Sequence, residues 1–119
     1  MTSESDDVTD VDEVNEVRLV GRVSGPPAQR SLPSGDELWT FRVVVPRPPS
    51  QRSRQTVDAL ECVAWSGRVR RSVARWSDGD VVEVWGAIRR RFYRAGGVTG
   101  SRVEVEATRA RVIRRAASA

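Results

Sequence analysis

The chain has 119 residues, which is enough for one domain with a modest core and too few for two. Apolar residues make up 39% of it and charged residues 30%, a balance that indicates a folded, soluble domain and excludes a wholly disordered chain. The N-terminus lacks the apolar stretch of a secretory signal, and no run approaches the length of a membrane span. We therefore expect a cytoplasmic protein with no membrane partner.

Charge is distributed very unevenly along the chain. All 20 basic residues are arginines, and the formal net charge is +4. Residues 1–16 hold seven of the 16 acids and no base, so the remainder carries 20 arginines against nine acids, a net charge of +11. A body this basic indicates a polyanionic partner, most often nucleic acid. The alternative is a basic surface that is merely solvated.

The residues that usually carry catalysis or bind metals are scarce. There is no histidine and only one cysteine, Cys62, so an internal disulfide is impossible and a zinc site lacks ligands. We interpret Cys62 as a small core residue. No glycine-rich phosphate loop opens a helix, and the nearby carboxylates flank a turn (Asp78, Asp80) or an exposed strand face (Glu104, Glu106). We expect no enzyme, no metal, no cofactor and no small-molecule substrate.

Three segments divide the chain: a disordered acidic tail over 1–13, a folded domain over 14–113 and a short tail over 114–119. The domain opens with a strand that has Val17, Leu19, Gly21 and Val23 on one face. Arg18, Val20 and Arg22 alternate with them on the other face. The following segment, SGPPAQRSLPSGDE, is dense in Gly, Pro and Ser and predicts a loop that carries Arg30.

The second strand is predicted over Leu38–Val45. Four apolar side chains on one of its faces predict core or subunit interface: Trp39, Phe41, Val43 and Val45. The next segment, PRPPSQRSRQ, predicts a loop whose arginines could meet a phosphate backbone: Arg47, Arg52 and Arg54.

The third strand is predicted over Thr56–Trp65, and the period then changes. Val69, Val73 and Trp76 recur at helical spacing with arginines between them, which predicts one short amphipathic helix over Gly67–Trp76. Its apolar stripe could plug the end of a barrel. Gly79 is the predicted left-handed residue after it.

The stretch from Gly79 to Val105 alternates most clearly. One set of side chains suits a buried core: Val82, Val84, Gly86 and Ile88. The other set places aromatic rings and guanidinium groups in one row: Trp85, Arg89, Arg91 and Tyr93. Such a row can stack bases and pair phosphates. The alternative is a half-exposed strand with solvated arginines and with aromatic residues packed on a neighbouring subunit.

A hairpin tip, RAGGVTG, and a last strand over Ser101–Val112 complete the chain. The order is three strands, a helix and two strands, which predicts an all-β OB-fold, a five-stranded Greek-key barrel with one short helix between strands 3 and 4. The face of this barrel often binds oligonucleotides.

Five short segments in this order resemble the bacterial single-stranded DNA-binding protein family: NEVRLVGRV, PAQRSLPSG, FRVV, ECVAW and DGDVVEVWGAIR. The resemblance runs from Asn15 to about Val112. It implies an OB-fold that binds single-stranded DNA without sequence preference in replication, recombination or repair, as a homo-oligomer, a tetramer or a dimer, associated with the nucleoid.

The same resemblance implies roles for individual residues. Trp65 and Tyr93 fall on base-stacking positions, and basic contacts fall on Arg30, Arg89 and Arg91. From the residues themselves, Trp85 and the arginines of the first strand and of the loop after the second are further candidates: Arg18, Arg22, Arg47, Arg52 and Arg54.

Several positions depart from the family pattern. Two stacking positions fall on Pro49 and Ala59, which have no aromatic face, and losing them weakens binding unless Trp39, Trp85 or Phe92 substitutes. Glu61 stands where the family tends to have a basic residue and would repel phosphate. With the sequence ending at Ala119, we expect a short variant without the family's acidic C-terminal tail.

Two alternatives to DNA protection remain open on the sequence. The lost stacking positions and Glu61 suit an OB module that has become an assembly partner with weakened DNA affinity. An RNA binder is equally consistent with stacking and phosphate pairing. The acidic segment Glu4–Glu16 could compete with DNA for the arginines or could simply be solvated.

Overall fold

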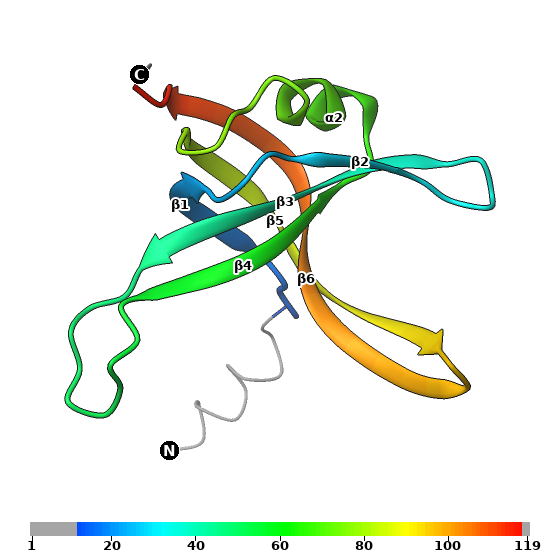
Figure 1. Cartoon of the computed structure of the whole chain (residues 1–119), viewed down its shortest axis with the longest axis horizontal. Coiled ribbons are helices and arrows are strands. Elements are labelled where there is room, and N and C mark those ends of the chain that lie inside the picture. The colour runs from blue at the N-terminus through cyan, green and yellow to red at the C-terminus, as the bar shows by residue number, and fades with distance from the viewer. Residues whose placement is uncertain (1–11, 118–119) are drawn as a thin grey trace.

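A computed structural model describes residues 12–117, which form a barrel of mostly antiparallel strands with one helix (Figure 1). The strands are β1 (Val17–Val23), β2 (Ala28–Ser31), β3 (Glu37–Pro46), β4 (Val57–Ala64), β5 (Val81–Ala95) and β6 (Val98–Arg114). The helix, α2 (Gly67–Val73), lies between β4 and β5. Most of the predicted acidic tail, 1–13, and the end of the short tail, 114–119, lie outside the described residues.

Five of the strands close on themselves. The order in the sheet is β1-β5-β6-β4-β3-β2, and a further pairing of β1 with β3 at Arg22↔Val44 and Val23↔Val43 closes the barrel. β4 and β6 are the parallel pair. This confirms the predicted OB-fold with its helix between the third and fourth barrel strands. β2, which pairs with β3 as an extension, was wrongly predicted as loop because its four exposed residues show no apolar alternation.

The core lies inside the barrel and under α2. Val23 of β1 is buried, and so are Phe41 and Val43 of β3, whose face was predicted as core or subunit interface. Val69 and Val73 of α2 are buried as well, and the Phe41 and Trp76 rings meet edge to face with centroids 5.1 Å apart. The helix therefore covers one end of the barrel, as its apolar stripe predicts.

Local capping sets the limits of α2. The Ser66 hydroxyl accepts a hydrogen bond from the Val69 N–H at 3.3 Å and caps the N-terminus. The helix ends at Val73, three residues earlier than predicted. Gly79 then takes φ +89°, the left-handed conformation expected of it.

Cys62 is a core residue, as predicted, with 2% of its surface exposed. Burial, together with the negative charges of Glu61 and Glu104, raises the pKa of its thiol to about 12. The thiol therefore stays protonated at neutral pH and has no nucleophilic character.

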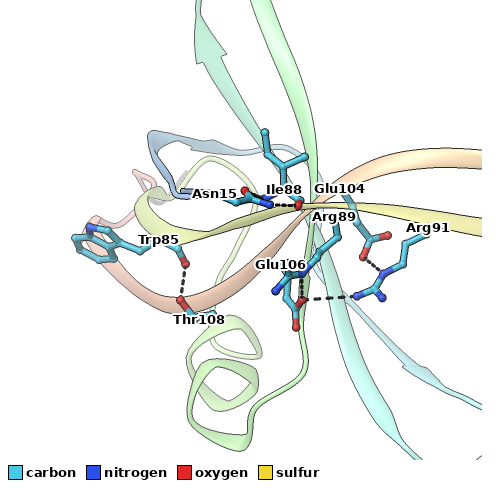
Figure 2. Close-up of polar contacts among 8 residues, drawn as sticks. All are labelled: Asn15, Trp85, Ile88, Arg89, Arg91, Glu104, Glu106 and Thr108. Carbon is cyan, nitrogen blue, oxygen red and sulfur yellow. Dashed lines mark hydrogen bonds and ion pairs between the residues drawn. The ribbon is translucent and has the colours of Figure 1, made fainter. Parts of the chain in front are cut away.

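β5 and β6 extend beyond the barrel as a long hairpin (Figure 1). Its turn is the pair Gly96–Gly97, both at positive φ, so the strands continue through the predicted tip. Ile88 was predicted as core but is 48% exposed, because β5 leaves the barrel near this residue. The Asn15 side chain holds that point by pairing with both backbone groups of Ile88, at 2.8 and 2.9 Å (Figure 2).

Candidate nucleic-acid interface

A groove of about 700 Å³ lies between the β2–β3 hairpin and the β5–β6 hairpin, which project to the same side of the barrel (Figure 1). Its floor crosses β3 and β4, where Phe41 and Cys62 contribute. The walls bring together aromatic, basic and acidic side chains: Arg30, Arg42, Glu61, Trp65, Arg91, Phe92, Tyr93, Arg102 and Glu104. Four of the residues predicted from the sequence therefore share one groove: Arg30, Trp65, Arg91 and Tyr93.

Trp65 stands at the junction of β4 and α2. Strand β4 ends one residue before it, and the N-cap Ser66 follows it, so both neighbours hold its backbone. The Arg91 guanidinium carbon lies 5.8 Å from the ring centroid, within cation–π range. The indole Nε1 is buried without a partner among the described residues. An indole ring can stack with a base on the face that the guanidinium does not cover.

Tyr93 and Phe92 occupy the part of the β5–β6 hairpin that faces the groove. Tyr93 pairs across the hairpin with Gly100, and a Cβ at Gly100 would come within 2.6 Å of the Tyr93 ring. Only glycine leaves room for the ring to lie over the neighbouring strand. Tyr93 stays 50% exposed and Phe92 73% exposed, so both rings offer surface to a ligand. Phe92, considered only as a substitute from the sequence, thus belongs to the groove.

Ion pairs neutralise the acids of the groove. Arg42 holds Glu61 with two hydrogen bonds, at 2.9 and 3.1 Å, so the predicted repulsion of phosphate by Glu61 is offset by its cross-strand neighbour. Glu104, expected on an exposed face, is only 8% exposed and is shared by Arg91 and Arg102 at 3.3 and 3.4 Å. Sequence reasoning missed Arg42 and Arg102; their alternation with the core residues of β3 and β6 was the available signal.

Arg89 lies on β5, as Arg91 does, but it is outside the groove lining. Its guanidinium pairs with Glu106 at 2.8 Å, and Arg91 reaches the same carboxylate at 3.8 Å (Figure 2). Arg89 therefore supports the position of Arg91 through the shared Glu106. The groove itself holds Arg30, which has no carboxylate partner among the described residues.

The predicted row along β5 is divided in two. Figure 2 shows Trp85 pointing away from Arg89 and Arg91. A register shift between Trp85 and Gly86, where the Thr108 hydroxyl donates to the Trp85 carbonyl at 3.3 Å, and the turn of β5 out of the barrel separate them. Trp85 instead stacks with Arg109, whose guanidinium carbon is 4.3 Å from the ring centroid.

The outer face of β1, β5 and β6 holds Arg18 and Arg22, which the sequence grouped with the stacking residues. Arg18 and Arg111 clamp the buried Glu83 at 2.6 and 2.7 Å. Burial raises the pKa of Glu83, but hydrogen bonds from Arg111 and Arg18 outweigh that effect, so the pKa lies below its ordinary value. Arg18, which was predicted to pair with DNA phosphates, therefore forms an ion pair with Glu83 inside the fold.

The loop between β3 and β4 also lies away from the groove lining. Arg47 forms an ion pair with Asp58, while Arg52 and Arg54 are exposed. Figure 1 shows this loop projecting from the barrel on the side away from the two hairpins. These three arginines are thus not brought to the aromatic residues.

Within residues 12–117, no three His, Cys, Asp or Glu side chains gather as metal ligands would. In the same range, no helix is long and apolar enough to cross a membrane.

The fold and the groove define the class: an OB-fold domain with an aromatic and arginine-rich groove between two hairpins. A model of the single-strand binding protein family matches residues 14–113. The chain is 32% identical over 93 residues to single-stranded DNA-binding protein 3 of Listeria innocua, covering 77% of this chain and 57% of that protein. It is 32% identical over 81 residues to the single-stranded DNA-binding protein of Halalkalibacterium halodurans, covering 67% and 48%.

The chain belongs to the single-strand binding protein family, and it spans about half the length of the relatives that it matches. Among solved structures it is similar to the Plasmodium falciparum SSB complex with single-stranded DNA, with a TM-score of 0.69 and 19% identity. That match covers 88% of this chain and 97% of the other and supports the OB-fold.

Proposed function

We propose that this chain binds single-stranded DNA without sequence preference, with bases stacked in the groove and phosphates paired to its arginines. One observation carries the proposal: Trp65, Arg91 and Tyr93 line a single groove together with Arg30. Aromatic faces accept any base, and guanidinium groups pair with any phosphate, so this combination has no means of reading sequence. The relatives, named as single-stranded DNA-binding proteins, support the same ligand.

The proposal extends to the setting in which the protein acts. A binder of exposed single strands would protect DNA during replication, recombination or repair, in the cytoplasm with the nucleoid. We propose that it acts as a homo-oligomer; the exposed Val20 and Ile113, 39% and 47% accessible, support a contact with a second copy. Sedimentation equilibrium that returned the mass of one chain at every concentration would contradict this assembly.

Alanine variants of the two stacking residues test the groove. Trp65→Ala and Tyr93→Ala should each weaken binding of labelled oligo(dT) about 5- to 150-fold, the equivalent of about 1–3 kcal/mol per lost stacking contact. Fluorescence anisotropy at low salt would measure Kd.

Trp85→Ala is the matched control, because Trp85 is an aromatic residue of β5, the strand of Tyr93, but lies outside the groove. It should bind like the wild type. Equal losses in all three variants would show that the groove is not the stacking site, and normal binding by Trp65→Ala and Tyr93→Ala would contradict the proposal.

A further inference from the structure

A second hollow, of about 440 Å³, lies between α2 and β6, on the helix-covered end of the barrel. Its floor is apolar and is formed by Trp76, Ala110 and Val112. Five arginines surround that floor: Arg68, Arg71, Arg75, Arg111 and Arg115. We call this site the α2–β6 hollow. None of its residues lines the groove.

The fold directs these arginines to one place. Arg68 and Arg71 lie on the side of α2 that is free because Val69 and Val73 face the core, and Arg75 lies in the turn that follows the helix. The Arg115 guanidinium is held by the Arg75 carbonyl at 2.9 Å and by Asp80 at 3.0 Å. Arg111 is held by Glu83 at 2.7 Å. The cluster is therefore built from α2, the turn after it, β6 and the residue that follows β6.

The charges of the α2–β6 hollow do not balance. Asp80 and Glu83 compensate Arg115 and Arg111. Arg68, Arg71 and Arg75 have no carboxylate within ion-pair distance among residues 12–117. Three like charges around one hollow repel one another, and a bound polyanion would relieve that repulsion.

We propose that the α2–β6 hollow binds the phosphate backbone of single-stranded DNA as a second contact beyond the groove. This inference rests on the proposed function. Continuity with the groove favours this ligand: Trp65 lines the groove and Arg68, only three residues later, lines the hollow, so a strand leaving the groove past Trp65 meets the arginines next. Guanidinium forks pair with phosphate oxygens in two-point contacts.

The length of the oligonucleotide separates the two contacts. An oligo(dT) of about 6 nucleotides should fit the groove alone, and one of about 15 should reach the hollow as well. In a variant carrying Arg68→Ala, Arg71→Ala and Arg75→Ala, Kd for the short strand should be unchanged. For the long strand, the slope of log K against log salt should fall in magnitude by about 2, at about 0.7 per lost phosphate contact.

A second triple variant controls for loss of charge in general. Arg90→Ala, Arg109→Ala and Arg114→Ala remove the same charge from exposed positions outside both sites. This control should keep the full salt slope with the long strand. Circular dichroism melts of both variants would show that each remains folded.

The remaining outcomes overturn the inference in distinguishable ways. If the wild type binds both strands and the first triple variant binds the long one equally well, the hollow is not a DNA contact, and the proposed function stands. Equal losses in both triple variants would also contradict a specific site. A variant that loses affinity only for a poly-glutamate peptide would assign the hollow to an acidic protein. If the wild type binds neither strand, the proposed function fails and the inference fails with it.

Discussion

At Gly86 the backbone of β6 lies too close to β5 for a side chain. A Cβ at this position would overlap the backbone carbonyl of Glu106, which cannot move without breaking the sheet. The register shift between Trp85 and Gly86 occurs at the same place. Absence of a side chain at one residue thus allows β5 to cross the barrel and continue into the hairpin that carries Tyr93.

Gly86→Ala should therefore destabilise the fold by at least about 2 kcal/mol, in the upper part of the range for overpacked sites. Urea unfolding would measure the free energy. Gly67→Ala is the matched control, since its Cβ would meet the flexible ends of Arg71, at 3.2 Å, and Arg70, at 4.0 Å, and alanine favours helix. A Gly86→Ala variant as stable as Gly67→Ala would contradict the close contact.

Single residues were predictable from the sequence where burial alone decides their place. Val82, Val84 and Cys62 are buried as their alternation predicts. Ile88 follows the same alternation and is exposed, because the pattern does not tell where a strand leaves the barrel. The charge of Glu61 was also misjudged, since its partner Arg42 is 19 residues away and meets it only through the β3–β4 register.

At the scale of elements, Asp80 connects the turn after α2 to the end of β6. Its carboxylate accepts hydrogen bonds from the Ser77 N–H at 2.9 Å, the Ala116 N–H at 2.7 Å and Arg115 at 3.0 Å. Burial raises the pKa of Asp80, but the hydrogen bonds from these donors together have a larger effect in the opposite direction. The pKa of Asp80 therefore lies below its ordinary value. The carboxylate therefore stabilises the fold in its charged form.

Asp80→Asn should cost about 1–3 kcal/mol at pH 7, because it leaves buried donors without a full acceptor. The pKa is lower in the folded state than the unfolded value of about 3.9, so the stabilisation is complete above that pH and is lost as pH falls through the folded pKa. The gap in Tm between wild type and variant should accordingly be widest at pH 7 and shrink below about pH 4.

Asp36→Asn controls for the loss of a carboxylate as such, since Asp36 is exposed in the β2–β3 turn. Its Tm at pH 7 should be close to that of the wild type. A constant gap between Asp80→Asn and wild type from pH 7 to pH 2 would contradict the role given to the charged form.

Elements with a strong apolar period were predictable, and those made by pairing alone were not. The period of β3 and the change of period at α2 both match the structure. β2 contains Gln29 and Arg30 among exposed residues and exists because β3 offers it an edge. β6 likewise runs to Arg114, beyond the predicted Val112, because it pairs with Val81 of β5.

For the whole molecule, the order of strands and helix predicted the barrel, but it did not predict which side chains lie together on the barrel surface. Alternation placed Trp85 and Tyr93 in one row, but β5 has a register shift after Trp85, and only Tyr93 of the two lines the groove. The basic excess of the chain is likewise divided: several arginines of the groove form ion pairs within it, while Arg68, Arg71 and Arg75 have no carboxylate partner within residues 12–117. Such positions depend on three-dimensional packing that one-dimensional patterns do not record.

Tryptophan fluorescence during titration with oligo(dT) tests the central claim most directly. The groove predicts saturable quenching at low salt, through Trp65, that weakens as salt rises. The quenching should persist in Trp85→Ala, disappear largely in Trp65→Phe, and be much weaker with a duplex of the same length. If single strands cause no quenching at low salt and show no binding by anisotropy, the groove does not stack bases, and the account of this protein as a single-strand binder is wrong.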